Sequence, residues 1–223
     1  MTTSSSEGQI LDAWEVNARA WERAVRDRRI ESRRLVTDQA IVDAVLSRSP
    51  RRVIDLGCGE GWLARTLAAE GVRVVGVDVV PSLVEAARSQ DGGEFHLLSY
   101  ADVAAGALKQ RADVVVCNFS LLGEASVDEL LAAVPSLLEA GGVLLVQTLH
   151  PLAVAATEPY RDGWRAGSWD GCGEGFATPA PWYFRTLGGW LAAFMAAGLE
   201  LLRIDEPLHP RTGRPASVIF TAG

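Results

Sequence analysis

The hydrophobic pattern of the chain changes at about residue 51, from helical spacing to short apolar runs that alternate with helical stretches. In the first part, Trp14, Ala18 and Trp21 recur at helical spacing, and a second apolar set follows Thr37. Residues 10–47 are therefore predicted to form two helices that precede the first strand.

Beyond residue 51 the apolar runs have the length of strands. They cover residues 52–56, 73–79, 95–98, 113–118, 143–149, 199–204 and 217–221. The helical stretches between them cover residues 62–69, 81–89, 127–138 and 187–197. Strands that are apolar on both faces and alternate with helices predict a parallel sheet with helices on each side. The turn-rich link through Pro207 and Pro210 is short enough for a hairpin, so the last two strands are expected to be antiparallel neighbours.

The length of 223 residues fits one α/β domain, and we expect residues 10–223 to form it. Residues 1–9, which are rich in serine and threonine, are expected to be a disordered tail, and residues 10–47 a helical cap. Residues 150–186 interrupt the alternation and are rich in glycine, proline and aromatic residues. A connection this long inside a compact domain is usually functional, so we expect a lid-like insertion over the substrate.

The composition and net charge of the chain limit the classes of molecule that it is expected to bind and the compartment in which it is expected to occur. The formal net charge is −7, which disfavours a nucleic-acid surface, although the arginines of residues 19–34 form either a solvated helix face or a local basic patch. Cys58, Cys117 and Cys172 are odd in number and widely spaced, which indicates neither a disulfide framework nor a metal site. No apolar run approaches the length that crosses a membrane. We therefore expect a cytoplasmic protein without a bound metal.

The strongest motif is a glycine-rich turn at residues 55–61, Asp-Leu-Gly-Cys-Gly-Glu-Gly, between a strand and a helix. Glycine permits positive φ angles and close approach of a ligand to the backbone. A dinucleotide fingerprint would place its third glycine at position 62, where this chain has Trp62. Asp55 would repel a pyrophosphate and attract a cation. The same pentapeptide at residues 171–175 neither follows a strand nor opens a helix, so we assign it no cofactor.

A second acid follows at the end of the next predicted strand. Asp78 lies about twenty residues beyond the glycines, the placement from which a carboxylate accepts hydrogen bonds from ribose hydroxyls. The sequence thus predicts a nucleoside site at the carboxyl ends of the first two strands.

Residues 55–61, Asp78 and residues 81–87 together resemble the class I S-adenosylmethionine-dependent methyltransferases, especially the small-molecule branch that includes quinone-biosynthesis methyltransferases. The resemblance extends from about residue 51 to the C-terminus. It implies a Rossmann-like seven-stranded sheet whose last strand is antiparallel, and S-adenosylmethionine as cofactor. It also implies a methionine site at the glycine turn and Asn118, a ribose site at Asp78, and an adenine site at Val79 and residues 99–102. The cofactor residues that it implies are Asp55, Gly57, Cys58, Gly59, Gly61, Asp78, Val79, Tyr100, Ala101 and Asn118.

Catalysis from such a cofactor chiefly requires alignment of the acceptor and exclusion of water. His150, at the end of the fifth predicted strand, is the candidate general base; alternatively it only caps that strand before Pro151. The candidates for the substrate pocket are the polar aromatic and cationic residues of the insertion: Tyr160, Trp164, Trp169, Tyr183 and Arg185. They suit a flat, apolar or cationic acceptor, or they bury the lid against the sheet. Trp14, Asn17 and Trp21 either close over the cofactor or pack in the core.

The expected function is methyl transfer to a small-molecule acceptor. One alternative is a methyltransferase-like binding module without turnover. The other is a nucleotide-cofactor dehydrogenase, which is disfavoured by Trp62 and by the lack of a paired tyrosine and lysine, since Lys109 is the only lysine.

Overall fold

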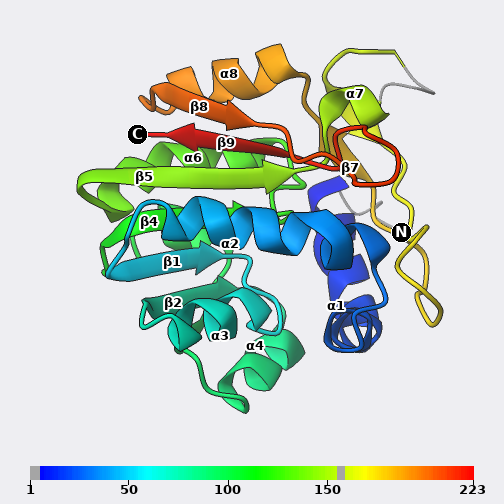
Figure 1. Cartoon of the computed structure of the whole chain (residues 1–223), viewed down its shortest axis with the longest axis horizontal. Coiled ribbons are helices and arrows are strands. Elements are labelled where there is room, and N and C mark those ends of the chain that lie inside the picture. Colours follow the sequence, from blue (N-terminus) through cyan, green and yellow to red (C-terminus); the bar gives the residue numbers. More distant parts are fainter. Residues whose placement is uncertain (1–5, 155–158) are drawn as a thin grey trace.

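The computed structural model describes residues 6–154 and 159–223 and contains a seven-stranded sheet between two layers of helices (Figure 1). The strands lie in the order β3-β2-β1-β4-β5-β9-β8. Their bounds are β1 (Arg52–Leu56), β2 (Arg73–Asp78), β3 (Glu94–Leu97), β4 (Ala112–Asn118), β5 (Leu138–Thr148), β8 (Leu201–Asp205) and β9 (Val218–Ala222). The pairs from β3 to β5 are parallel, whereas β9 is antiparallel to both β5 and β8. The predicted Rossmann-like sheet with an antiparallel last strand is confirmed.

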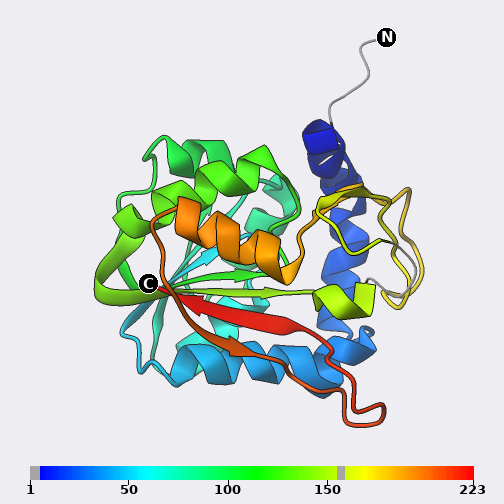
Figure 2. The same cartoon turned by 90° about the horizontal axis from the view of Figure 1, so that it is seen from above.

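Helices cover both faces of this sheet (Figure 2). On one face lie α2 (Asp38–Leu46), α3 (Trp62–Ala69) and α4 (Pro81–Arg88), and on the other α5 (Tyr100–Ala104), α6 (Ala125–Leu137) and α8 (Leu187–Ala196). Successive strand side chains point to opposite faces, so Val53 packs with Ile41 of α2 while Ile54 packs with Leu130 of α6 in a second core. The strands are thus buried on both sides, and their carboxyl ends meet at one edge.

The N-terminal helix α1 (Ser6–Arg26) lies across that edge of the sheet (Figure 2). It begins at Ser6, so the expected disorder of residues 6–9 is corrected; residues 1–5 lie outside the described part. The Glu7 carboxylate accepts hydrogen bonds from the backbone N–H of Glu124 (2.8 Å) and the hydroxyl of Ser126 (2.7 Å). These long-range contacts hold the first turn, and local sequence does not reveal them. After α1, the chain forms a π-helical segment, η1 (Arg33–Thr37).

The predicted insertion contains elements of its own. It begins with α7 (Pro151–Val154) and includes a two-stranded antiparallel sheet of β6 (Gly163–Arg165) and β7 (Trp182–Phe184). Each of these strands has only three residues, too few for a recognisable alternating pattern. The loop between them packs beside α1, where Ala177 N–H donates to Asn17 Oδ1 at 2.6 Å. The part of the insertion at residues 155–158 lies outside the described residues.

Strand β5 differs from the expectation because it begins at Leu138 rather than at residue 143. Gly141 and Gly142, which lie between the expected helix and the expected strand, are inside the strand, and the register with β4 shifts between Ala112 and Val114. A glycine at positive φ is compatible with such an irregularity as well as with a helix end. In the described residues, no helix is long and apolar enough to cross a membrane.

Candidate functional site

A cavity of about 320 Å³ lies at the carboxyl ends of β1, β2 and β4 and extends to α1. Its described lining comes from the glycine turn, the end of β2, the segment after β3, the segment after β4 and one face of α1: Gly57, Gly59, Asp78, Val79, Val80, Leu83, Ser99, Tyr100, Ala101, Asn118, Phe119, Ser120, Leu122, Gly123, Ser126, Glu7, Ile10, Leu11, Trp14 and Trp21. Open α/β sheets bind ligands at this edge, because the loops that follow parallel strands meet there.

Most residues that the sequence assigned to the cofactor meet in this cavity. Those that line it are Gly57, Gly59, Asp78, Val79, Tyr100, Ala101 and Asn118. Asp55, Cys58 and Gly61 are absent from the described lining. Asp55 and Cys58 are buried, and Gly61 begins α3 with a positive φ of 83°. These three residues shape the turn from behind instead of facing the cavity.

The glycine turn is held tightly against the end of β2. The N–H groups of Gly57 and Cys58 donate to the carbonyl of Val77, and the N–H of Gly59 donates to the Asp78 carboxylate at 2.8 Å. Gly57 has a φ of +80°, and a Cβ atom there would overlap the side chain of Ser120. Only glycine fits that position, so the backbone itself forms the cavity wall.

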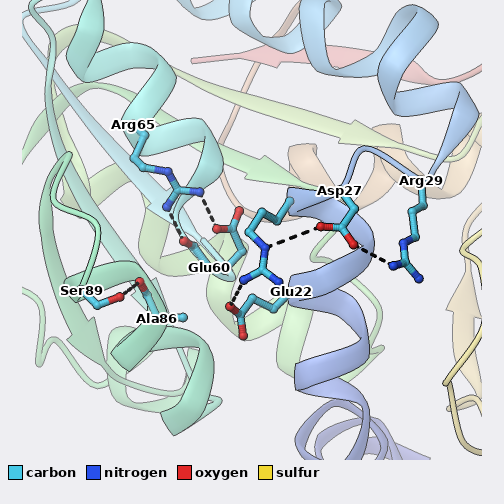
Figure 3. A network of polar contacts seen from close by, with 8 residues as sticks. Glu22, Asp27, Arg29, Glu60, Arg65, Ala86 and Ser89 are labelled. Carbon is cyan, nitrogen blue, oxygen red and sulfur yellow. Dashed lines mark hydrogen bonds and ion pairs between the residues drawn. The ribbon is translucent and has the colours of Figure 1, made fainter.

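A buried ion pair supports the same turn. The carboxylate of Glu60 pairs with Arg65, which also donates to the Glu60 carbonyl at 2.6 Å (Figure 3). At the end of α1, arginines are matched with acids: Arg26 pairs with Glu22 and Asp27. Arg29 pairs with Asp27 (Figure 3). These pairs support the interpretation of residues 22–29 as a solvated face, whereas Arg33 of the same basic segment is buried.

Two acids lie close together under the turn. Asp78 accepts from Val80 N–H at 2.9 Å and from Gly59 N–H; burial raises the pKa of Asp78, and these hydrogen bonds oppose the rise. Burial, with the nearby charge of Asp78, raises the pKa of Asp55 to about 7. Desolvated carboxyl groups that repel one another favour a ligand with positive charge or hydrogen-bond donors. Residues 6–154 and 159–223 contain no group of three or more His, Cys, Asp or Glu arranged to hold a metal ion.

Asn118, which lines the cavity at the end of β4, is held by Gln147, a buried residue of β5. Its amide N–H₂ donates to Asn118 Oδ1 at 2.8 Å and to the carbonyl of Thr37 at 3.0 Å, while Ser217 donates to its oxygen at 3.3 Å. Because the oxygen of Asn118 is turned toward Gln147, its N–H₂ group is the part left for a ligand. Gln147 thus determines which amide group Asn118 presents to the cavity.

Sequence reasoning missed the first turn of α1. Glu7 and Ile10 line the cavity, with Trp14 and Trp21 farther along the same helix. The spacing of Ile10, Trp14 and Trp21 is that of one helix face, and extending this face back across the expected boundary would have reached Glu7. Asn17, considered with these tryptophans, is buried outside the described lining.

His150 lies away from this described lining. Its side chain is fully buried, its Nε2 is 2.7 Å from Glu206 Oε1, and its Nδ1 accepts from Leu152 N–H at 3.2 Å. Since Nδ1 accepts, Nε2 carries the proton and donates to Glu206. With both ring nitrogens engaged, this geometry supports a structural anchor at the start of the insertion rather than the expected general base.

The five substrate candidates of the insertion are likewise absent from the described cavity lining. Trp169 lies in a second layer, where its ring centroid is 5.4 Å from that of Trp14 and 6.5 Å from that of Trp21. Tyr160 is exposed, and its hydroxyl accepts from Leu187 N–H at 2.9 Å. The side chains of Trp169 and Tyr160 therefore attach the insertion to the rest of the domain and do not belong to the described cavity lining.

The other three candidates hold the loop that follows β4. Tyr183 N–H donates to the carbonyl of Leu122 at 2.7 Å, and Trp164 Nε1 donates to Glu124 at 3.1 Å. Arg185 donates to the carbonyls of residues 123 and 124. Because this loop lines the cavity, these three residues position the wall from behind.

Comparison with known proteins identifies relatives of this chain. The profile of a family described as a methyltransferase domain matches residues 26–203. The chain is 34% identical over 114 residues to the ubiquinone biosynthesis O-methyltransferase of Xanthomonas axonopodis pv. citri, covering 49% of this chain and 47% of that protein. It is 39% identical over 111 residues to trans-aconitate 2-methyltransferase of Rhodococcus jostii, covering 48% and 41%. The matches thus span less than half the length of these curated relatives.

The fold is also found in solved structures. The 1,6-didemethyltoxoflavin-N1-methyltransferase of Burkholderia thailandensis, with bound 1,6-didemethyltoxoflavin and S-adenosylhomocysteine, has a TM-score of 0.68 and 18% sequence identity. That comparison covers 100% of this chain and 91% of the other. At this identity the likeness establishes the fold.

Proposed function

The chain belongs to the methyltransferase-domain family, and on this premise we propose that it transfers a methyl group from S-adenosylmethionine to a small-molecule acceptor. The observation that carries the proposal is the cavity at the strand ends, with the glycine turn and Asp78 on one side and Asn118 on the other. Its volume of about 320 Å³ is within the range of small-molecule sites. The family match favours this function over the alternative of a nucleotide-cofactor dehydrogenase.

The residues present fit this cofactor. Gly57 and Gly59 have no side chains to keep a ligand from the backbone, and the Asp78 carboxylate retains lone pairs for ribose hydroxyls beside its two backbone hydrogen bonds. In the proposal, Val79 contacts the face of the adenine, and Tyr100 with Ala101 contacts its edge. Asn118 lies at the methionine end, and the acid of Asp55 favours the positive charge from behind the turn.

When bound, S-adenosylmethionine would supply a methyl group on a positively charged sulfur, which is already activated for transfer to a lone pair of the acceptor. The protein chiefly has to align the acceptor and exclude water. Trp14 and Trp21 of α1, covered by Trp169 of the insertion, form the apolar side of the cavity that serves this purpose. The proposal assigns no general base, because His150 is occupied by Glu206.

Calorimetric titration with S-adenosylmethionine tests cofactor binding. We expect Asp78→Ala to weaken binding at least tenfold, about 1.4 kcal/mol, because it removes the ribose ligand and releases Gly59. Asp43→Asn, a change on the exposed side of α2, is the control and should bind like the wild type. Equal affinity of Asp78→Ala and the wild type would contradict the assignment.

Turnover is tested by incubating the protein and S-adenosylmethionine with a metabolite extract and searching by mass spectrometry for compounds that gain one methyl group. A methylated product that depends on the protein supports the enzyme. Tight binding with no product in any extract would favour the alternative of a non-catalytic binding module.

We also place this reaction in the cytoplasm. The support is chemical: Cys58, Cys117 and Cys172 are all unpaired, as is usual for thiols in a reducing compartment. Pull-down of the protein from fractionated cells, followed by immunoblotting, tests the location.

A further inference from the structure

Three hydrogen-bonding atoms beside the cavity are buried without a partner among the described residues: Arg33 Nη2, Thr37 Oγ1 and Trp169 Nε1. The guanidinium and indole nitrogens can only donate hydrogen bonds, and a hydroxyl can donate as well. A buried donor that lacks a partner destabilises the folded protein, and more so when it is charged. Three such groups in one region indicate a ligand that supplies acceptor atoms.

Two of the three groups, those of Arg33 and Trp169, lie beside Trp21, and Thr37 comes four residues after Arg33 in η1. The Arg33 guanidinium carbon lies 5.6 Å from the centroid of the Trp21 ring, and the Trp169 ring is 6.5 Å from the same ring. Burial raises the pKa of Cys172 and the nearby charge of Arg33 opposes this rise, while the N–H of Cys172 donates to the carbonyl of Trp169 at 2.9 Å. The loop of Trp169 therefore lies against the guanidinium.

Arg33 and Thr37 reach this place from one face of η1. Their exposed fractions are 8% and 1%, whereas Arg34 between them is exposed. The wide turn of a π-helix brings residues four apart nearly into line, and such segments are frequent at functional sites. The pair therefore presents a cation and a hydroxyl in the same direction.

This region adjoins the end of the cavity where Asn118 lies. The Thr37 carbonyl accepts from Gln147, which also donates to Asn118 Oδ1, so Thr37 is two hydrogen bonds from the cavity lining. Trp21 is itself part of that lining. A group bound by Arg33 would thus lie beside the end at which methyl transfer is proposed to occur.

The net charge around Arg33 indicates which kind of oxyanion this region can bind. Arg33 Nε pairs with Asp38 at 2.8 Å, which offsets part of the positive charge and leaves Nη2 for another acceptor. The guanidinium is further enclosed by Trp62, whose ring centroid is 4.7 Å away. A single, partly neutralised cation with neutral donors beside it suits a singly charged oxyanion and would not compensate the burial of a phosphate dianion.

We propose that Arg33, Thr37 and Trp169 bind a carboxylate of the methyl acceptor, so that the substrates of this protein are small carboxylic acids. This inference rests on the proposed function, because it names the acceptor class of the same reaction.

The first test uses the unaltered protein, S-adenosylmethionine with a labelled methyl group, and a metabolite extract separated at pH 8 on an anion exchanger. We expect label in the retained fraction, loss of labelling after the carboxylates of that fraction are converted to amides, and no effect of phosphatase. Label confined to the unretained fraction would overturn the carboxylate site while leaving methyl transfer intact, and so would labelling abolished by phosphatase. No label in any fraction together with no binding of S-adenosylmethionine would instead refute the proposed function and, with it, this inference.

The second test compares two arginines of η1. Arg33→Gln should raise KM for the labelled acid at least tenfold with kcat changed much less, and leave the Kd of S-adenosylmethionine unchanged; Arg33→Lys should restore part of the loss. Arg34→Gln, a matched change at the exposed neighbour, should behave like the wild type. Thermal melting followed by circular dichroism checks that each variant is folded. Unchanged KM in a folded Arg33→Gln variant would overturn the assignment.

Discussion

Comparing alanine substitutions at two glycines with nearly equal φ angles distinguishes two costs: the backbone strain of a positive φ, and the steric overlap of the added Cβ atom with neighbouring side chains. Gly57 has φ +80° and Gly71 has φ +81°, but a Cβ at Gly57 would overlap Ser120, whereas at Gly71 it would meet nothing within 4 Å. We therefore expect Gly57→Ala to destabilise the protein more than Gly71→Ala.

The magnitude follows from the contacts. The positive φ alone costs about 1–2 kcal/mol for alanine in either variant. At position 57 the new methyl group also displaces Ser120, whose hydroxyl donates to the Leu56 carbonyl at 2.7 Å. Crowding adds about 1–3 kcal/mol, and loss of that hydrogen bond adds about 1 kcal/mol. The excess of Gly57→Ala over Gly71→Ala is thus about 2–4 kcal/mol, roughly 5–15 °C in Tm for a chain of this size.

Urea and thermal unfolding of the two variants and the wild type measure this difference, and calorimetry with S-adenosylmethionine follows its effect on the cavity. Gly71→Ala should bind like the wild type, whereas Gly57→Ala should bind at least tenfold more weakly, because the turn is displaced. Equal losses of stability in the two variants would refute the crowding that we infer at Gly57.

Three further predictions concern the acids and the histidine. The pKa of Asp55 is raised to about 7 in the folded protein from an ordinary value of 3.8, so its ionisation opposes folding increasingly as the pH rises between these values. Asp55→Asn should therefore raise Tm at pH 8 and change it little at pH 4; a constant difference across this range in melting experiments would show that Asp55 ionises normally. Glu7→Gln weakens the attachment of α1 to Glu124 and Ser126, so limited proteolysis should cleave the first turns of α1 faster, and equal cleavage rates would count against that attachment. His150→Gln should lower Tm by removing the buried imidazole that donates to Glu206 while leaving the Kd of S-adenosylmethionine unchanged, and a large rise in that Kd would place His150 at the cofactor after all.

Much of the cavity lining could be predicted because its signals are local. A strand, a glycine turn and a helix follow each other within residues 52–69, and Asp78 ends the next strand. Parallel neighbours end at the same edge, so locating the strand ends also brought Asp78 and Asn118 together. Asp55 was located correctly at the end of β1, but the direction of its side chain depends on the sheet around it.

The amino-acid sequence alone determined the parallel sheet, the antiparallel last strand and the glycine turn, because alternation, apolar runs and glycine spacing are properties of neighbouring residues. Only the tertiary structure decided what faces the cavity. Glu7 is held at the cavity wall by Glu124, which is 117 residues away in the sequence. His150 is bonded to Glu206, which follows the insertion in the sequence. Trp21 likewise packs against both Trp169 and Arg33. No spacing of residues in the sequence predicts these contacts.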